Sequence, residues 1–388
     1  MHEHCKNVYI NIIKKIKEEK MTEILFLNEQ EMIKAGVLDS ARCVDVLDEM
    51  FQLLGKGDYV MGGPRHNEHG IKISFPEKSE FPNMPLDGPD RRFMAMVAYL
   101  GGRFNVSGEK WYGSNIINPQ RGLPRSVLMT VLNDPDTCEP IAIMSANLVS
   151  AVRTGAVPGV GVRYLARKGA EVCAIIGAGP VNKACFQAIF AEAKNLKEII
   201  VYDLFPEKAA AFIEWSKKEL GIGGIVAEST EEAVRHGDII SVAASAVKPV
   251  NMKDEWIKKG SLIVTTGGAN IEESYMFSAK IVYDNPLMWE AYMQDAKEIP
   301  SDEKPHPRKQ TFDLIEAGKL PKFSDALSLG KITIGTENGR ENDDERILLQ
   351  TSGIPTEDVA WSYECYLKAK ELGIGTKLQL WPEKPHWV

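Results

Sequence analysis

The chain has no apolar run long enough to cross a membrane and no basic block with interleaved aromatic residues. Its 388 residues include 46 Lys and Arg against 54 Asp and Glu, so the formal net charge at pH 7 is −8. The first absence argues against a transmembrane protein, and an acidic chain repels the phosphates of nucleic acid. Nothing near the N-terminus resembles a cleavable secretion signal. We therefore expect a soluble, cytoplasmic protein with neither a membrane nor a nucleic acid as partner.

Metal-site spacing is also absent. The cysteines show neither C-x-x-C nor mixed Cys/His spacing, and they are Cys5, Cys43, Cys138, Cys173, Cys185 and Cys365. Cys173 and Cys185 fall within apolar segments, so we predict that both are buried in a reducing compartment. His66 and His69 could bind a cation together with Glu68, but no third ligand presents itself. We predict no metal and a solvated loop for these histidines.

The most informative segment is a βαβ pattern that begins at residue 171. Residues 172–176 are apolar and rich in β-branched side chains, as expected of a buried parallel strand. Gly177 permits a tight turn, and Gly179 lets the backbone approach a pyrophosphate at the start of a helix opening near Pro180. The second strand ends at Asp203, whose carboxylate would accept from the adenosine ribose and repel a 2′-phosphate. The pattern predicts a dinucleotide site that takes NAD, with NADP less favoured.

The third small position of this motif holds Asn182 in place of glycine. We expect it to loosen the packing of helix on strand without removing the anion site. The residues predicted to bind the dinucleotide are Thr154, Gly177, Ala178, Gly179, Pro180, Val181, Asn182, Asp203, Ala244, Ser245 and Gly267.

Chain length predicts two domains. Short apolar segments at 239–243, 262–266 and 281–284 alternate with helical patterns and predict a Rossmann-type doubly wound sheet in an α/β domain over 151–334. Residues 21–150 mix helical and alternating β patterns and predict a second, α+β domain. A helix near the C-terminus needs a partner surface, so we expect 335–388 to return to that domain. Residues 1–20 are predicted to be an N-terminal extension.

Five motifs, in this order, resemble the ornithine cyclodeaminase/μ-crystallin family. They are EKWY at 109–112, NPQRGLP at 118–124, NLVSAVRTGA at 147–156, IGAG at 176–179 and SGIPTED at 352–358. The resemblance covers nearly the whole chain after Met21. It implies a homodimer in which 21–150 and 335–388 form a substrate-binding and dimerisation domain. A small amino-acid or imino-acid substrate would lie between this domain and the NAD domain.

In similar proteins, cations at the positions of Arg65, Lys110 and Arg153 hold the substrate carboxylate. Fixed cations suit this task, because C2 must be kept facing the nicotinamide. Lys110 could also donate or accept a proton if burial lowers its pKa. The competing interpretation is that these residues are ordinary surface or ion-pair cations.

The chain departs from cyclodeaminases at a position where they carry an aspartate that handles the substrate amino group. Ala269 stands there and cannot take a proton. Asn270 or Glu272 would have to act as the catalytic group in its place, or ring closure is not performed.

Two further features set the chain apart. Arg125 stands where cyclodeaminases carry a small hydroxyl residue. It is predicted to bind a smaller substrate or one with extra negative charge. The alternative is that Arg125 does no more than form an ion pair with Glu109 or Asp87. Residues 77–92 resemble an insertion found in a long subgroup of the family, some members of which are named as a component of a tyramine oxidase.

Three functions remain open from the sequence. The first is an NAD-dependent enzyme that transfers hydride at C2 of a small amino or imino acid, as a dehydrogenase, imine reductase or cyclodeaminase. The second is a noncatalytic, μ-crystallin-like protein that binds NAD(P) and a small ligand. The third is a partner subunit of an amine-oxidising system.

Overall fold

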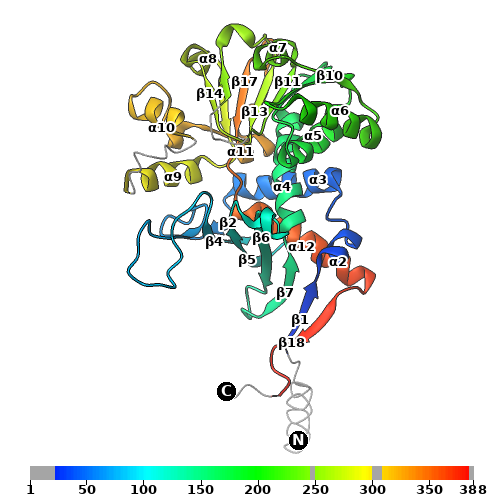
Figure 1. The fold of residues 1–388 in the computed structure, drawn as a ribbon, viewed down its shortest axis with the longest axis vertical. Coiled ribbons are helices and arrows are strands. Elements are labelled where there is room, and N and C mark those ends of the chain that lie inside the picture. The colour runs from blue at the N-terminus through cyan, green and yellow to red at the C-terminus, as the bar shows by residue number, and fades with distance from the viewer. Residues whose placement is uncertain (1–21, 245–249, 299–307, 384–388) are drawn as a thin grey trace, which may run out of the picture.

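The computed structural model describes residues 22–244, 250–298 and 308–383. The predicted extension 1–20 and the predicted cofactor contact Ser245 lie outside these ranges. None of the described helices combines the length and the apolar composition needed to cross a bilayer. Two sheets lie one above the other in Figure 1, with helices α3 (Ser40–Lys56) and α4 (Asn147–Leu165) between them.

The first sheet carries the expected α+β domain. Its strands follow the order β18 (Thr376–Gln379), β1 (Glu23–Leu27), β7 (Pro140–Ser145), β6 (Ser126–Asn133), β5 (Val106–Ser114), β4 (Arg92–Leu100) and β2 (Tyr59–Met61), with β3 (Ile71–Ser74) also paired to β4. Its N-terminal helices are α2 (Glu29–Lys34) and α3 (Ser40–Lys56), and a 3₁₀ turn spans Asn118–Arg121. A capping box between Asn28 and Glu31 starts α2, as two reciprocal hydrogen bonds show. β18 pairs with β1, so the described end of the chain lies on this first sheet.

The second sheet is parallel at every described pairing. Its order is β10 (Gly224–Val226), β9 (Glu198–Tyr202), β8 (Val172–Ile176), β11 (Ile239–Val242), β13 (Leu262–Thr265), β17 (Ile347–Gln350), β15 (Lys280–Tyr283) and β16 (Leu327–Ser328). Because the chain moves outward from β8 first on one side and then on the other, the order reverses between β8 and β11. A doubly wound sheet binds its ligand at this switch point, so the Rossmann-type prediction is confirmed.

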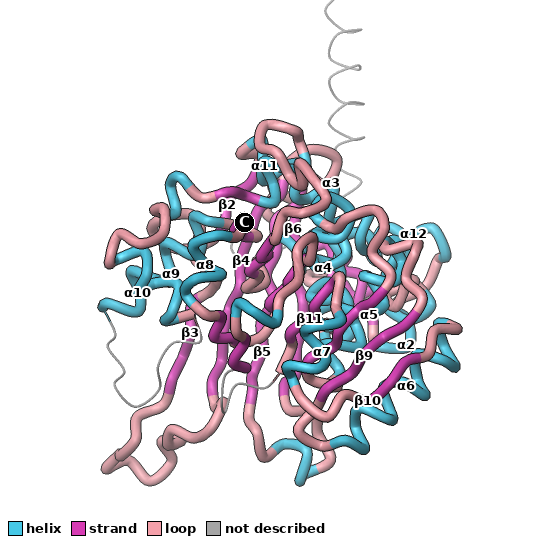
Figure 2. The backbone as a smooth tube through the Cα atoms, turned by 90° about the horizontal axis from the view of Figure 1, so that it is seen from above, coloured by secondary structure: helices cyan, strands magenta, loops and turns pink. Residues whose placement is uncertain are grey.

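Helices flank this sheet on two sides, which both views show, with α5 and α6 on one side and α8, α9 and α10 on the other (Figures 1 and 2). The helices are α5 (Pro180–Glu192), α6 (Pro206–Leu220), α7 (Thr230–His236), α8 (Glu273–Ser278), α9 (Pro286–Glu298), α10 (Lys309–Glu316) and α11 (Leu329–Thr333). Short 3₁₀ turns span Asp254–Trp256 and Phe323–Asp325, and β12 (Val250–Met252) pairs with β14 (Ala269–Ile271). Cys173 and Cys185 are buried in β8 and α5, as predicted.

The expected range 335–388 for the returning segment needs one correction. β17 belongs to the second sheet, between β13 and β15, so residues 347–350 are part of the dinucleotide domain. The chain rejoins the first domain only with α12 (Pro355–Leu372), which packs on β4, β5 and α3. The physical reason is pairing, because β17 is a fully buried apolar strand that fills the space between two other strands.

Two glycines let α4 (Asn147–Leu165) approach α5 closely. A Cβ on Gly155 would lie 2.3 Å from the carbonyl carbon of Ala184, and a Cβ on Gly159 would lie 3.0 Å from Cβ of Ala188. The helix that leads into the second domain is therefore held directly against the helix of the glycine turn.

Replacing Gly155 with alanine is expected to destabilise the protein by about 1–3 kcal/mol, because the new methyl group collides with backbone that cannot move easily. This loss should outweigh the better helix propensity of alanine, about 1 kcal/mol. Urea unfolding measures the change. Gly169→Ala is the control, since a Cβ there meets no atom within 4 Å. Equal unfolding midpoints for the two variants would contradict the close contact.

Candidate functional site

The glycine turn lies where three parallel strands end. Gly177 follows β8 with a φ of 90°, and a Cβ there would come 2.9 Å from Cα of Ala244. A Cβ on Gly267, which follows β13, would come 2.8 Å from the carbonyl oxygen of the same Ala244. Both positions exclude a side chain, so the ends of β8, β11 and β13 meet closely at the switch point.

The start of α5 fits the pyrophosphate of a dinucleotide. Gly179 caps the helix, and a Cβ there would meet nothing within 4 Å, so space is open beside the first amides of the helix. Pro180 occupies the first helical position, where a missing N–H costs nothing, and Val181 is exposed beside it. These residues and their open surroundings suit a bound anion.

Asn182 corrects one expectation. Its side chain is fully buried and donates to the carbonyl oxygens of Ile176, Gly177 and Ser241, while its Oδ1 accepts from the Ser241 hydroxyl. The amide therefore fastens the helix to the strand and the turn, and it does not loosen them. Its hydrogen bonds hold the glycine turn of the predicted dinucleotide site in place, which a third glycine could not do because it has no side chain.

Asp203 lies at the end of β9, beside the turn. Its carboxylate accepts from the backbone N–H of Ala178 at 2.8 Å and of Phe205 at 3.0 Å. The acid is thus fixed next to the glycine turn, in the place where a ribose hydroxyl would be bound. Thr154 lies on α4, where its hydroxyl donates to the carbonyl of Ser150 at 2.6 Å.

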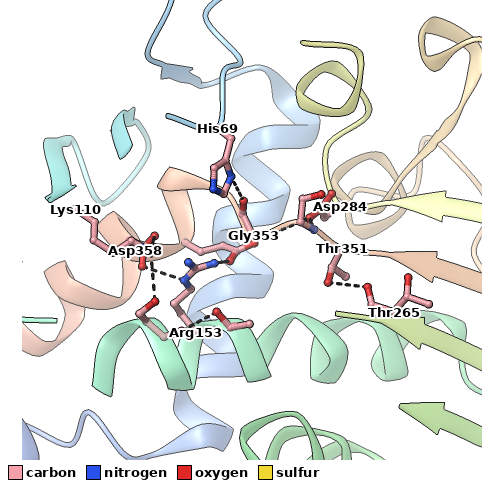
Figure 3. A network of polar contacts seen from close by, with 12 residues as sticks. His69, Lys110, Arg153, Thr265, Asp284, Thr351, Gly353 and Asp358 are labelled. Atoms are coloured by element: carbon pink, nitrogen blue, oxygen red, sulfur yellow. Dashed lines mark hydrogen bonds and ion pairs between the residues drawn. The ribbon is translucent and has the colours of Figure 1, made fainter. Parts of the chain in front are cut away.

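A second cluster joins two predicted cations to two acids. Lys110 on β5 and Arg153 on α4 are both buried, and they meet the first turn of α12 (Figure 3). The Lys110 Nζ lies 2.8 Å from Asp358 Oδ2, and Arg153 Nε donates to Asp358 Oδ1 at 2.9 Å. Arg153 Nη1 donates to Glu357 Oε2 at 2.5 Å. We call these four residues the buried charge network.

Burial shifts the pKa values of the buried charge network. It lowers the pKa of Lys110 to about 8, and nearby Arg153 acts in the same direction while Asp358 opposes it. Burial also raises the pKa of the Glu357 carboxyl to about 8, against the opposing effect of Arg153. For the Arg153 guanidinium, the two acids outweigh desolvation and raise the pKa, so it stays charged. The raised pKa favours the neutral form of Glu357, so the acids of the network balance its cations only in part.

The loop after β17 completes the site. Gly353 has a φ of 73°, and a Cβ there would lie 2.4 Å from Arg153 Nη1, so only glycine fits. Asp284 accepts from the backbone N–H groups of Ser352 and Gly353 and from Trp289 Nε1. The carbonyl of Gly353 binds His69 Nδ1 at 2.8 Å (Figure 3).

His69 is not the solvated loop residue that the sequence suggested. Desolvation, strengthened by the nearby cations of the site, lowers its pKa to about 3, so the ring is neutral and donates from Nδ1 to Gly353. It also lies against the ring of Tyr292, with centroids 5.3 Å apart. The described residues contain no group of three or more His, Cys, Asp or Glu arranged to hold a metal ion.

Sequence reasoning missed the roles of Asp284, Glu357 and Asp358. The sequence pattern of 353–358 indicates a turn, but Pro355 is the first residue of a helix whose opening acids are buried. Proline at the first helical position, followed by two acids, is a signal for a helix N-terminus and could have revealed this.

The other predicted cations lie outside the buried charge network. Arg65 forms ion pairs with Glu68 at 2.9 Å and with Asp295 of α9 at 2.6 Å, and so it links the two domains. Arg125 Nε donates to Asp90 at 2.6 Å, an acid that the sequence did not suggest as its partner.

Asn270 and Glu272, the proposed substitutes for the missing aspartate, make their described contacts outside the buried charge network. Asn270 lies on β14, exposed, and donates to Asn251 at 3.2 Å. Glu272 precedes α8 and accepts from the backbone N–H of Asp254 at 2.8 Å. Within the described part of the chain, no hydrogen bond or ion pair connects either residue to the buried charge network.

Comparison with known proteins agrees with this arrangement. Residues 37–372 match the model of the ornithine cyclodeaminase/mu-crystallin family. The chain belongs to this family. It is 31% identical to N-((2S)-2-amino-2-carboxyethyl)-L-glutamate dehydrogenase of Staphylococcus aureus over 92% of the chain and 99% of that relative.

Two solved structures are similar over nearly their whole length. Thermococcus litoralis Δ¹-pyrroline-2-carboxylate reductase, in complex with NADH and L-proline, is 26% identical with a TM-score of 0.73, over 91% of this chain and 99% of that one. An archaeal alanine dehydrogenase dimer with bound NAD is 25% identical with a TM-score of 0.73, over 92% and 100%. These relatives support NAD as the cofactor of the chain.

We expect Asp203→Ser to move coenzyme preference toward NADPH, because it removes the negative charge that repels a 2′-phosphate. Fluorescence titration should show the ratio of the NADPH and NADH dissociation constants falling by about tenfold or more, equivalent to 1.4 kcal/mol. Glu198→Gln, which removes an exposed acid from the same strand, is the control. An unchanged ratio would show that Asp203 serves only to hold the turn.

Proposed function

We propose that this protein is an NAD-dependent enzyme that transfers hydride at C2 of a small amino or imino acid. The observation that carries the proposal is the position of the buried charge network. Arg153 lies close to Gly353, which follows the carboxyl end of β17, so two buried cations suited to a carboxylate lie at the edge where doubly wound sheets typically bind ligands.

The charge of the network favours a bound carboxylate. Burial favours the neutral form of Glu357, so the charges of Lys110 and Arg153 are not fully balanced, and a substrate carboxylate would balance what remains. Since the site is buried, the attraction is screened little by salt and water.

When bound, NAD would accept a hydride from C2 as the amino nitrogen loses a proton, and NADH would supply the reverse reduction of an imine. The task of the chain is to hold C2 in place, which Lys110 and Arg153 do through the carboxylate. Asp358 fixes both cations at once, and the pKa of about 8 lets Lys110 release or take up a proton near neutral pH.

Dehydrogenase or imine reductase activity is favoured over cyclodeaminase activity. Ala269 provides no acid, and the contacts of Asn270 and Glu272 lie with Asn251 and Asp254. The relatives named above, which act on an amino-acid conjugate of glutamate, on a pyrroline carboxylate and on alanine, support the same choice.

A homodimer in the cytoplasm completes the proposal. The face of the first sheet opposite α12 carries exposed apolar side chains, including Phe93, Val127 and Met129, and Phe93 stacks on Trp111 at 5.8 Å. An apolar face of this kind suits an interface between two copies, and an archaeal relative is a dimer. The free, buried cysteines suit a reducing compartment.

NADH absorbance tests the activity directly, with amino acids, cyclic imines, and 2-oxo acids plus ammonium as substrates. Turnover is expected, and Lys110→Met should reduce kcat/KM by about 100-fold or more while NADH binding persists, because a charge-assisted contact is lost. Lys377→Met, on the exposed strand β18 at the far edge of the same sheet, is the control. Intact NADH binding without any turnover would favour the noncatalytic alternative.

The pH profile tests the network. Lys110 is a cation only below its lowered pKa of about 8, and Glu357 is neutral only below its raised pKa of about 8. As pH rises through this value both changes remove positive charge, so log kcat/KM should fall with a slope of about −2. In Lys110→Arg the guanidinium stays charged, and the slope should become about −1. If the slope of log kcat/KM above this pH were the same in the wild-type and variant proteins, Lys110 would be excluded from carboxylate binding.

A further inference from the structure

A second group of charges lies on the same face of the first sheet as Lys110. The register places Lys110 between Met96 and Thr130, and four residues further along β5 it places Ser114 between Arg92 and Ser126. Because alternate residues of a strand share a face, Lys110, Tyr112 and Ser114 all point to the same side. The Lys110 level and the Ser114 level of the sheet therefore belong to one continuous surface.

One aspartate collects the charges at the Ser114 level. Asp90 accepts from Arg125 Nε at 2.6 Å and from the Ser114 hydroxyl at 2.6 Å, and it also forms an ion pair with Arg92. Ser114 and Ser126 are joined through their hydroxyls at 2.8 Å. Two guanidinium groups thus share one carboxylate, and the group keeps a net positive charge.

The backbone of Asp90 is held in an unusual conformation. Its φ of 58° lies in the left-handed region, which aspartate adopts more readily than most residues but still at a cost. The segment between β3 and β4 that carries it extends beyond the sheet (Figure 2). This conformation sets Asp90 against Arg92 and Arg125 and so holds the two cations together.

Tyr112 connects the two groups of charges. The Lys110 Nζ lies 5.6 Å from the centre of its ring, and the Arg92 guanidinium carbon lies at the same distance. The two cations are therefore no more than twice that distance apart, across a mostly buried aromatic ring. An acid of about four to five carbon atoms with a carboxylate at each end bridges such a gap when charge-assisted contacts are made at both ends.

We propose that the substrate is a dicarboxylic amino or imino acid, whose second carboxylate is bound by Arg92 and Arg125. The inference rests on the proposed function for the first carboxylate, which Lys110 and Arg153 hold. Asp90 acts as a positioning residue, because it keeps two guanidinium groups together that would otherwise repel each other. A substrate with a distal ammonium group, such as a diamino acid, is repelled at this end of the site.

The structural alternative is that Arg125 forms only a surface ion pair. Its side chain is 59% exposed, and an exposed pair of this kind stabilises a protein little, because solvent screens it and the side chain loses freedom. A stabilising role would also need only one cation for Asp90, whereas two are present. The excess of positive charge is what a ligand anion requires.

Binding of unreactive acids tests the inference without turnover. Calorimetry on the NADH-bound protein should show glutarate binding at least tenfold more tightly than pentanoate, which has the same length but one carboxylate. Arg125→Gln and Arg92→Gln should each weaken glutarate binding by about tenfold or more and leave pentanoate within twofold, since each removes one charge-assisted contact. Arg121→Gln, an exposed arginine of the neighbouring 3₁₀ turn, should change neither.

Turnover gives the second readout. With ammonium, 2-oxoglutarate should be reduced with a higher kcat/KM than 2-oxopentanoate, and Arg125→Gln should remove this difference mainly through KM. Equal binding of glutarate and pentanoate to the wild-type protein, or equal weakening of both acids in the arginine variants, overturns the inference. Selective glutarate binding without turnover of any acid would overturn the proposed function alone, and turnover restricted to monocarboxylic substrates would overturn the inference alone.

Discussion

The buried charge network of Lys110, Arg153, Glu357 and Asp358 is the interaction on which the rest of the structure depends. Its four members come from three elements: β5 supplies Lys110, α4 supplies Arg153, and α12 supplies both acids. Removing Asp358 would leave the buried Lys110 ammonium without its acidic partner, and breaking a buried ion pair in this way typically costs about 3–5 kcal/mol. The network therefore fixes the helix that leads into the dinucleotide domain and the helix that returns from it.

Close contacts of three glycines lie at the carboxyl ends of strands of the second sheet, and one of them involves the buried charge network. Gly177, Gly267 and Gly353 follow β8, β13 and β17, and each has a neighbour where a side chain would otherwise stand. The first two meet Ala244 and the third meets the Arg153 guanidinium. The same physical requirement, the absence of a Cβ, thus serves both the dinucleotide turn and the buried charge network.

Much of the dinucleotide half could be predicted from the sequence because its signals are local. A buried strand, Gly177 and Gly179, a helix and Asp203 occur in one short segment, and the structure reproduces that order. The expectation for Asn182 was wrong because its partners include Ser241, which lies on another strand. The sequence shows a polar residue in place of glycine, but only the fold shows which carbonyl groups it satisfies.

The charge partners could not be predicted because they are distant in sequence. The resemblance to the family points to Lys110 and Arg153 as substrate-binding residues. Asp358 lies 205 residues beyond Arg153, and the sequence pattern around it predicts a turn. The position of β17 between β13 and β15 could not be predicted either, because it depends on pairing with strands that are distant in sequence. Arg125 stands out in the sequence, but its partner Asp90 lies in a loop whose path follows no periodic pattern.

The segment from β17 to α12 explains how one site can be shared by two domains. Residues 347–350 form a strand of the dinucleotide sheet, and residues 355–372 form a helix that packs on the first sheet. Between them, Asp284 holds the N–H groups of Ser352 and Gly353, and His69 holds the carbonyl of Gly353 from the other domain. Because this short connection is fixed from both sides, the acids on α12 keep a constant position relative to the edge where the cofactor binds. The hydrogen bond between His69 and Gly353 and the ion pair between Arg65 and Asp295 both cross between the two domains, so they oppose movement of one domain against the other.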